Sequence, residues 1–527
     1  LLHLYEGYSY TVSCSMSKES RIKKSLLNAR INLICYLVSL VIAFFSRKIF
    51  IDQLGVEFIG LTGTLSSLLS FLNLAELGVG SAIGYVLYKP IYEDDKIKIN
   101  EIISIFGYLY RCIGLYILGA GVILSFFLPW IFPNTSFTWL IIYIGYYAYL
   151  ASSLFGYFIN YRQTLLSADQ RNYEVTSYYQ VVTSTKIILQ MLLALYIRSF
   201  ALYLINELIF GFIYTLILNW RIDKVYPWLA SDLKLGRKLF KKYPEIGKYV
   251  KQLFIHKVTT FVQYQLTPFL IYSYVSLPIV ALYGNYTLIT QKLQGLISGI
   301  LDSTSAGVGN LISEGNIEKI VKIYQELFAV RMLIAGISAT CIAVLSSPFI
   351  SIWLGEEYPL QSLIVNVIAL QLFMYMLRGT TDAFIYGYGL FYDVWAPVAE
   401  SALFIATSMV FGSLWGLPGV LCGPLLSMLI IIYIWKPYFL FSKGFKLPFY
   451  KYWQVFFIHI TPIVVSYILS IRIYDLLLKK DFPMASWMNW LFSAFLFFTI
   501  MSFCSIVSMY IVSKGMRDFI HRFTKRK

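Results

Sequence analysis

Long apolar runs, separated by short polar segments, recur along the whole sequence. A helix needs about 20 consecutive apolar residues to cross roughly 30 Å of hydrocarbon. The runs therefore predict about fourteen membrane-spanning helices, at residues 29–51, 57–86, 102–131, 138–160, 174–197, 200–220, 252–275, 278–304, 326–354, 361–386, 394–414, 416–438, 453–474 and 486–513. The expected fold class is an all-α, polytopic membrane protein.

The composition agrees with this fold class. Hydrophobic residues make up 58% of the 527 residues and charged residues only 13%, against about 25% charged residues in soluble domains. A soluble enzyme, a secreted disulfide scaffold and a disordered protein are thereby excluded. The 6 Cys are scattered without a Cys-x-x-Cys pair and the 4 His lie far apart, so we expect neither a metal site nor a cofactor.

The distribution of positive charge predicts the orientation in the membrane. With the N-terminus in the cytoplasm, about 31 Lys and Arg fall in cytoplasmic segments and about 4 in outer ones, as the positive-inside rule requires. Both termini should therefore be cytoplasmic. The basic segment 221–251 is better explained by anionic headgroups than by nucleic acid. Because the outer loops are short, they leave no room for an extracellular catalytic domain.

Four short landmarks occur twice in the same order, about 220–230 residues apart, which indicates an internal duplication. An even number of spans separates the copies, so the repeats should be parallel, with an axis along the membrane normal. The matching pairs are Gly60–Gly63 with Ala281–Gly284, Leu77–Ile83 with Ala306–Ile312, Tyr110–Arg111 with Val330–Arg331, and Pro129–Trp130 with Pro348–Phe349.

These patterns divide the chain into segments. Met16 opens a stretch typical of a native start, so residues 1–15 are candidates for a non-native leader. The predicted segments are a cytoplasmic N-terminal segment 1–28, a six-helix bundle 29–220, a basic cytoplasmic linker 221–251, a second six-helix bundle 252–438, two extra transmembrane helices within 439–513 and a basic cytoplasmic tail 514–527.

Several charged residues fall inside the predicted spans. A Lys or Arg that faces lipid at the bilayer centre costs roughly 2.5–3.5 kcal/mol, so these cations should face partners or an aqueous cavity. The basic residues are Arg47, Lys48, Arg111, Lys186, Lys257, Lys292, Arg331 and Arg378, and the acids are Glu76, Glu207, Asp302, Glu326, Asp382 and Glu400.

Some of these cations have a local explanation. Arg378 and Asp382 are four residues apart on one helix, which favours an ion pair. Arg111, Arg331 and Lys257 lie near the cytoplasmic ends of their spans, where snorkelling to the headgroups explains them as well as a cavity does.

Lys186, Lys292 and the adjacent pair Arg47 and Lys48 are harder to explain locally. Lys186 and Lys292 lie near mid-depth with no acid within a helical turn. These four residues therefore predict a cavity with surplus positive charge. Such a cavity attracts an anion, and phosphate matches Arg and Lys well.

Several stretches resemble a known transporter family: Gly55–Ala82, Tyr161–Gln170, Tyr283–Tyr286, Val308–Asn310 and Ile352–Gly355. They are similar to the polysaccharide-export family of the MOP flippase superfamily, the O-unit flippases related to lipid II flippases and MATE transporters. The resemblance implies two six-helix bundles that form a V-shaped central cavity, here with two extra C-terminal helices. It also implies an undecaprenyl-diphosphate-linked oligosaccharide as substrate and the bacterial inner membrane as location.

The sequence departs from the family at two places. The charged residue of the first span is Arg47, and Lys48 follows where related lipid II flippases have an acid. The seventh span usually carries an acid in its middle, but Gln263–Thr267 has none. Ion coupling through the seventh span is therefore in doubt.

We predict a flippase, not an enzyme, that moves lipid-linked O-antigen or capsule units outward by alternating access. Membrane lipids, and the polysaccharide polymerase with its chain-length machinery, are the expected partners. The predicted substrate-binding residues are Arg47, Lys48, Lys186 and Lys292, joined by Arg111 and Arg331 in the inward-open state, and the candidates for ion coupling are Glu76, Asp302 and Glu400.

Two rival functions stay open. A MATE-type multidrug or cation antiporter should hold cationic drugs near unpaired intramembrane acids, yet the deep charges here are mostly basic. A polysaccharide polymerase or lipid-dependent glycosyltransferase normally needs a sizeable outer loop. An ATP-driven pump lacks support because no Gly-x-x-x-x-Gly-Lys-[Ser/Thr] loop occurs.

Overall fold

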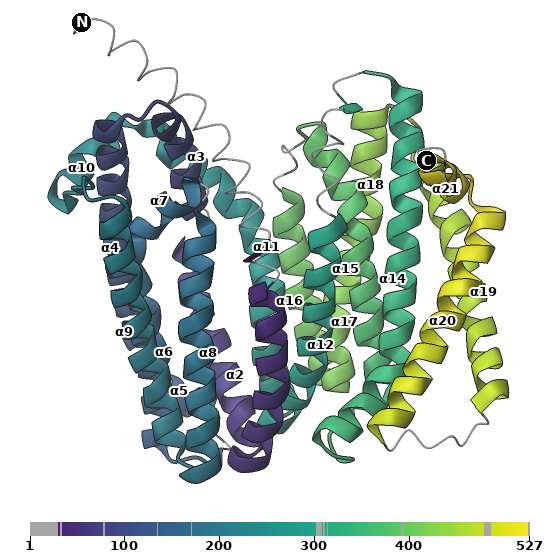
Figure 1. Ribbon diagram of the computed structural model, residues 1–527, viewed down its shortest axis with the longest axis horizontal. Helices are drawn as coiled ribbons and strands as arrows, with labels where there is room; N and C mark the ends of the chain where they lie inside the picture. The colour runs from purple at the N-terminus through teal and green to yellow at the C-terminus, as the bar shows by residue number, and fades with distance from the viewer. Residues whose placement is uncertain are drawn as a thin grey trace, which may run out of the picture. The chain divides into compact units, whose positions relative to one another are not determined.

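A computed structural model describes residues 30–524, except 32–33, 77–78, 134, 170, 302–307, 309–310, 313–314, 391–392, 394 and 479–485. Within these residues the regular structure is helical (Figure 1), which confirms the predicted all-α fold class. Of the described helices, 10 are long and apolar enough to cross a membrane, whereas the total of about fourteen stays a prediction. The suggested non-native segment 1–15 and Asp302 lie outside the described residues.

The chain divides into two compact units, residues 1–261 and 262–527. The predicted linker 221–251 belongs to the first unit, and the segment 439–513, where two extra helices are predicted, belongs to the second. Each unit is described below by itself.

The first unit holds a bundle in which α6 packs against α2, α4 and α9, and α8 packs against α9. Its helices, in chain order, are a first helix Ile34–Leu54, α2 Val56–Leu72, η1 Asn73–Glu76, α3 Val79–Tyr92, α4 Lys96–Ser125, α5 Leu128–Ile131, α6 Trp139–Phe158, η2 Asn160–Arg162, α7 Gln163–Ala168, α8 Asn172–Tyr196, α9 Phe200–Val225 and α10 Leu233–Lys242.

A glycine sets the close approach of α6 and α9. A Cβ atom at Gly211 on α9 would lie 2.4 Å from the hydroxyl oxygen of Ser152 on α6. A side chain at this position would force the Ser152 hydroxyl to move, because real Cβ contacts are longer. This contact holds together two helices that line the pocket described below.

The predicted second span, 57–86, is divided into α2, η1 and α3. Polar side chains at the break find partners on neighbouring helices. Asn73 Oδ1 accepts hydrogen bonds from Ser153 and Tyr157 on α6, each at 3.0 Å. The same Tyr157 hydroxyl lies 2.9 Å from a carboxylate oxygen of Glu76, so its one proton is shared between the two acceptors, and Glu76 also accepts a hydrogen bond from Tyr110 on α4. Because buried polar groups need such partners, the break is stabilised by these contacts.

The helix α11, Pro244–Tyr274, spans the division between the units. The second unit continues with α12 Leu277–Leu301, α14 Ile317–Leu354, α15 Ser362–Gly387, α16 Trp395–Trp415, α17 Leu417–Met428, η4 Leu429–Trp435, α18 Lys436–Phe439, η5 Leu440–Phe445, α19 Tyr450–Leu478, α20 Trp487–Val512 and α21 Lys514–Thr524.

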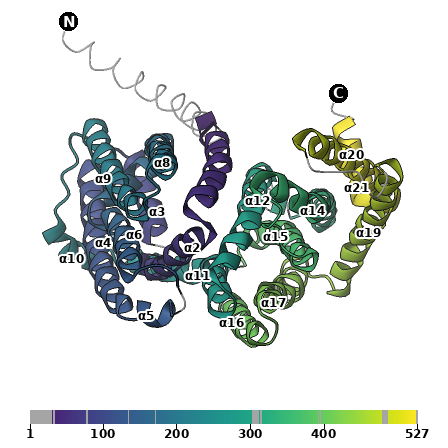
Figure 2. The ribbon, with the colours of Figure 1, turned by 90° about the horizontal axis from the view of Figure 1, so that it is seen from below.

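The core of the second unit surrounds the long helix α14. Seen from below, α12, α14 and α15 run side by side (Figure 2). Tyr324 on α14 is fully buried and contacts the rings of Phe328, Phe384, Phe441 and Phe445. Such aromatic packing adds to the burial of apolar area.

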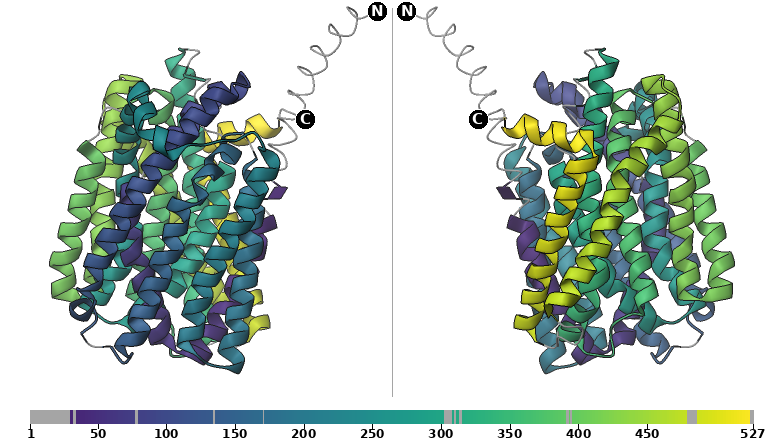
Figure 3. Two further views of the ribbon diagram at one scale, coloured as in Figure 1. Left: turned by 90° about the vertical axis from the view of Figure 1, so that its left-hand side faces the viewer. Right: turned by 90° about the vertical axis from the view of Figure 1, so that its right-hand side faces the viewer.

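The two helices α19 and α20 pack against each other and against α14 (Figure 3). Ser466 and Ser508 share a hydrogen bond of 2.7 Å between them, as is common between membrane helices. The indole N–H of Trp490 on α20 donates to the carbonyl of Leu345 on α14 at 3.1 Å. These two helices are therefore part of the second unit's packing.

Candidate functional site

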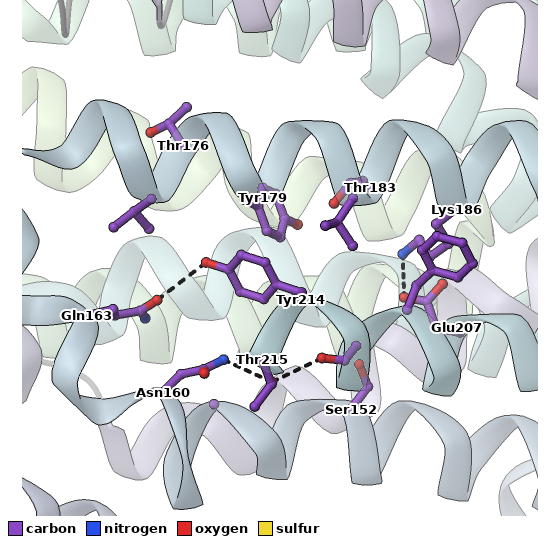
Figure 4. Close-up of a pocket in the computed structure, with 15 residues that line it drawn as sticks. Ser152, Asn160, Gln163, Thr176, Tyr179, Thr183, Lys186, Glu207, Tyr214 and Thr215 are labelled. Carbon is purple, nitrogen blue, oxygen red and sulfur yellow. Dashed lines mark hydrogen bonds and ion pairs between the residues drawn. The ribbon is translucent and has the colours of Figure 1, made fainter. Parts of the chain in front are cut away.

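A pocket of about 460 Å³ lies inside the first unit, between α6, η2, α7, α8 and α9 (Figure 4). This volume is in the range of small-molecule sites, roughly 300–1,000 Å³. Most of its lining side chains are polar. The lining residues are Ser152, Gly156, Asn160, Gln163, Val175, Thr176, Tyr179, Val182, Thr183, Lys186, Glu207, Phe210, Gly211, Tyr214 and Thr215.

One ion pair lies in the pocket, between Lys186 on α8 and Glu207 on α9 (Figure 4). The Nζ atom of Lys186 lies 2.6 Å from Oε1 of Glu207, and the side chains are 17% and 18% exposed. The amide of Gln190 donates to the other oxygen of Glu207 at 3.4 Å. No acid lies within a helical turn of Lys186, but the charge that was expected to be unpaired at this residue is paired. Its partner comes from the next helix, 21 residues away.

The polar residues of α8 that line the pocket are spaced by three and four positions. Thr176, Tyr179, Thr183 and Lys186 follow this spacing, which puts side chains on one face of a helix. This polar stripe also explains why α8 is not among the helices counted as candidate spans. The spacing is visible in the sequence and could have indicated the pocket.

The opposite wall of the pocket is a network of amides and hydroxyls (Figure 4). Asn160 donates to the hydroxyl of Thr215 at 3.1 Å and accepts from Asn219 at 2.9 Å. The Tyr214 hydroxyl donates to Gln163 at 3.4 Å. The formal charges in the lining are those of Lys186 and Glu207, so the pocket is neutral overall. It offers hydrogen-bond donors and acceptors together.

Glu174, the acidic residue of α8, is not among the residues that the sequence patterns singled out. Its side chain is 4% exposed and accepts hydrogen bonds from Arg221 on α9 at 2.7 Å and 3.2 Å. Arg171 lies 3.5 Å from the same carboxylate. The spacing of Arg171 and Glu174 was a local signal for this cluster, whereas the contact of Arg221 depends on helix packing.

Arg47 and Lys48 lie on the first helix and point in different directions. Lys48 Nζ lies 3.4 Å from Asp52 Oδ2, one turn later, and both side chains are well exposed. Arg47 is partly buried on the same helix. Adjacent helical residues are about 100° apart around the axis, so the two side chains leave the helix in different directions, and their role at the substrate stays a prediction.

Arg111 and Arg331, which the predicted repeat pairs with each other, have different environments. Arg111 is exposed on α4, on the same face as the exposed Leu115. Arg331 is 6% exposed on α14, and its Nη1 donates to the carbonyl of Met376 at 3.4 Å. Its guanidinium packs against Gly379: a Cβ atom added to Gly379 would lie 2.2 Å from Nη1 of Arg331. Sequence similarity did not indicate this difference in packing.

The remaining predicted residues lie elsewhere in the second unit. Lys292 is partly buried on α12, and Glu400 is buried on α16. The predicted ion pair of Arg378 and Asp382 is confirmed, with Nε and Oδ2 3.0 Å apart. Asp382 also accepts a hydrogen bond from Lys436 at 2.7 Å. The roles predicted for Lys292, Glu400, Glu76 and the other site residues stay predictions.

In the first unit, helices apolar enough to cross a membrane thus border a polar pocket that contains an ion pair. The comparison with solved structures gives the fold. This chain has the fold of a MOP-type transporter and is a multi-pass membrane protein. No protein-family model and no curated protein matches the sequence.

Two structural neighbours carry this assignment. A lipid II flippase MurJ in an inward closed conformation has a TM-score of 0.62 at 15% identity, over 90% of this chain and 98% of that chain. An inward-facing multidrug resistance MATE family transporter of the MOP superfamily has a TM-score of 0.57 at 15% identity, over 78% of this chain and 96% of that chain. At this identity, the similarity is one of fold.

Proposed function

We propose that this chain is a flippase that moves undecaprenyl-diphosphate-linked oligosaccharide units, of the O-antigen or capsule type, across the bacterial inner membrane. The fold it shares with a lipid II flippase supports a lipid-linked substrate. The sequence stretches that resemble O-unit flippases support an oligosaccharide headgroup.

The observation that carries the proposal is the neutral, polar pocket of the first unit. A sugar headgroup has many hydroxyls, each of which needs a donor or an acceptor when it leaves water. The pocket supplies both kinds of group from α6, α7, α8 and α9. An apolar drug would make no use of either kind of group.

Lys186 has a defined role in this proposal. The diphosphate competes with Glu207 for the ammonium group, because a charge-assisted hydrogen bond to phosphate is as favourable as one to a carboxylate. Arg47 and Lys48 are further candidates for contact with the substrate within the first unit, and Lys292 is a separate candidate in the second unit. The ion pair keeps Lys186 neutralised while the pocket is empty of substrate.

The membrane potential supplies a driving force. Each negative charge that moves out of a negative interior gains about 2.3 kcal/mol per 100 mV. A diphosphate headgroup therefore needs no coupled ion for net export. Both termini lie in the cytoplasm, and the polymerase with its chain-length machinery takes up the product on the outer side.

A gene deletion tests the proposal in cells. Loss of the chain should leave lipid-linked oligosaccharide in the cytoplasmic leaflet and remove surface polysaccharide, and re-expression should restore both. Susceptibility to cationic drugs should not change. If drug susceptibility rose while surface polysaccharide stayed normal, the MATE-type alternative would replace the flippase, since a MATE transporter shares the fold as well.

A further inference from the structure

A second pocket, of about 130 Å³, lies within the second unit and takes no part in the site described above. It is bordered by α11, α12, α15 and α17. Among the described residues, its lining carries no formal charge and is made largely of threonine, glutamine and tyrosine side chains. This lining is unusual for a membrane bundle, where unpartnered polar groups are costly.

Several of these polar groups have unused hydrogen-bonding capacity among the described residues. The Tyr283 hydroxyl and the Gln291 amide make no hydrogen bond there. Gln371 donates through Nε2 to the carbonyl of Leu421 at 2.8 Å, which leaves its Oε1 as an acceptor. Thr287 donates to its own helix at 3.2 Å, so its oxygen can still accept. The pocket thus offers donors and acceptors to a guest.

The chemistry of the lining selects the class of guest. A phosphate or an ammonium group would lose its hydration with no opposite charge in return, which is unfavourable at membrane depth. An apolar guest would leave the Tyr283 hydroxyl and the Oε1 atom of Gln371 without a partner in the pocket, whereas the Gln291 amide is exposed at its rim. A neutral group rich in hydroxyls matches the lining in both respects, and the face of the Tyr283 ring can stack on it.

The size of the pocket indicates how much of such a guest it holds. A cavity of about 150 Å³ holds one benzene molecule, so a pocket of about 130 Å³ matches a single six-membered ring. We propose that this pocket is a subsite for one uncharged sugar ring of the transported headgroup, a proposal that rests on the flippase function. The sugar ring exchanges hydrogen bonds with Tyr283, Gln291 and Gln371.

Two fluorescent probes in proteoliposomes test the subsite: a polyprenyl diphosphate that carries an oligosaccharide, and the same polyprenyl diphosphate without sugar. Tyr283→Phe removes only a hydroxyl, and Gln371→Leu removes an amide at nearly constant volume. The double variant with both substitutions should slow transport of the sugar-bearing lipid about tenfold, as expected for the loss of neutral hydrogen bonds. Transport of the sugar-free lipid should stay within about twofold of the wild-type rate.

Gln454→Leu is the matched control, because Gln454 is exposed on α19 and lines none of the pockets described. It should leave both rates unchanged, and the unfolding temperature of each variant checks its fold.

Equal effects of the pocket variants on the two lipids, or no effect on either, would overturn the subsite while the flippase function stands. A changed Na⁺ dependence of transport would overturn it in favour of a cation site. If the wild-type chain moves neither lipid, the flippase proposal itself fails, and the subsite falls with it.

Discussion

The ammonium group of Lys186 on α8 lies 2.6 Å from the carboxylate of Glu207 on α9, inside a polar pocket of the first unit. The pair makes the pocket neutral, whereas a surplus of positive charge was predicted. Breaking such a pair leaves one charge uncompensated in a poorly hydrated place. The pair is therefore either a structural brace or a position from which Lys186 is released to an anionic substrate.

Substitution of each partner distinguishes these two roles. If Lys186 binds the diphosphate, Lys186→Ala should lower transport of the lipid-linked oligosaccharide by about 10- to 100-fold, the loss expected for a charged hydrogen bond. Glu207→Gln frees the ammonium group and should keep the rate within about threefold of wild type. The measurement is the initial transport rate at equal amounts of inserted protein.

The structural alternative predicts another pattern. Both single variants would then lose activity alike, and the paired replacement Lys186→Met with Glu207→Leu would restore it, since an apolar pair can replace a buried ion pair. That result would remove Lys186 from the substrate site.

A second prediction concerns Asp382, which accepts hydrogen bonds from Arg378 at 3.0 Å and from Lys436 at 2.7 Å. Asp382→Asn should destabilise the second unit by about 3–5 kcal/mol, because two partly buried cations lose their carboxylate. Unfolding in detergent by added denaturant measures this loss. The control is Asp223→Asn, since Asp223 is 63% exposed in its pair with Arg162 and should matter by less than about 1 kcal/mol. Equal stability of the two variants would contradict the role given to Asp382.

Ser513 joins α20, α21 and α19. His459 Nδ1 lies 2.6 Å from the carbonyl of Val455 and so must donate to it, which leaves Nε2 to accept from Ser513 at 2.8 Å. The same Ser513 oxygen accepts the N–H of Met516 in the first turn of α21, at 3.1 Å.

Ser513→Ala should therefore cost about 1–3 kcal/mol, since it removes a buried hydrogen bond and a helix cap. Ser513→Thr keeps the hydroxyl and should recover most of the loss. The thermal unfolding midpoint measures both variants, with Ser413→Ala as the control, because Ser413 is exposed and its hydroxyl donates to the carbonyl of Val410 on its own helix. If Ser513→Ala had the same unfolding midpoint as the control, the contacts of the Ser513 hydroxyl would contribute nothing to stability.

The packing of α10 against α4 predicts whether alanine in place of Gly236 stabilises or destabilises the protein. A Cβ at Gly236 would lie 2.5 Å from the carbonyl oxygen of Ser104 and 2.5 Å from Cβ of Tyr108. Alanine normally favours a helix over glycine by about 1 kcal/mol, but here the clash should reverse the sign and cost about 1–3 kcal/mol. Gly119→Ala on α4 has open space and should be neutral or stabilising. Thermal unfolding of the two variants checks the contrast, and stabilisation by Gly236→Ala would contradict the docking.

Local patterns in the sequence predicted the helical fold and one of the ion pairs. Apolar runs gave helices close to their observed places, and the spacing of Arg378 and Asp382 gave their contact, because both depend on residues near one another in the chain. The pairing of Lys186 with Glu207 and of Arg221 with Glu174 depends on how α8 packs against α9. No residue spacing encodes that packing directly.

The environments of Arg111 and Arg331 show the same limit. The two residues occupy matching places in the predicted repeat, yet one is exposed and the other is buried beside Gly379. Which face of a membrane helix meets protein and which meets lipid depends on its neighbours, since both faces are apolar. The break of the second span at Asn73 and Glu76 likewise required partners from α4 and α6.

The most direct measurement is translocation by the purified full chain in liposomes that contain a fluorescent polyprenyl-diphosphate oligosaccharide. A membrane-impermeant quencher reports the fraction of headgroups on the outer leaflet, and ethidium uptake into the same vesicles reports drug transport. The account predicts that the protein moves protected headgroups to the quencher, faster under an imposed potential than under a pH gradient of equal energy. Headgroups that stay protected while ethidium is transported would contradict it.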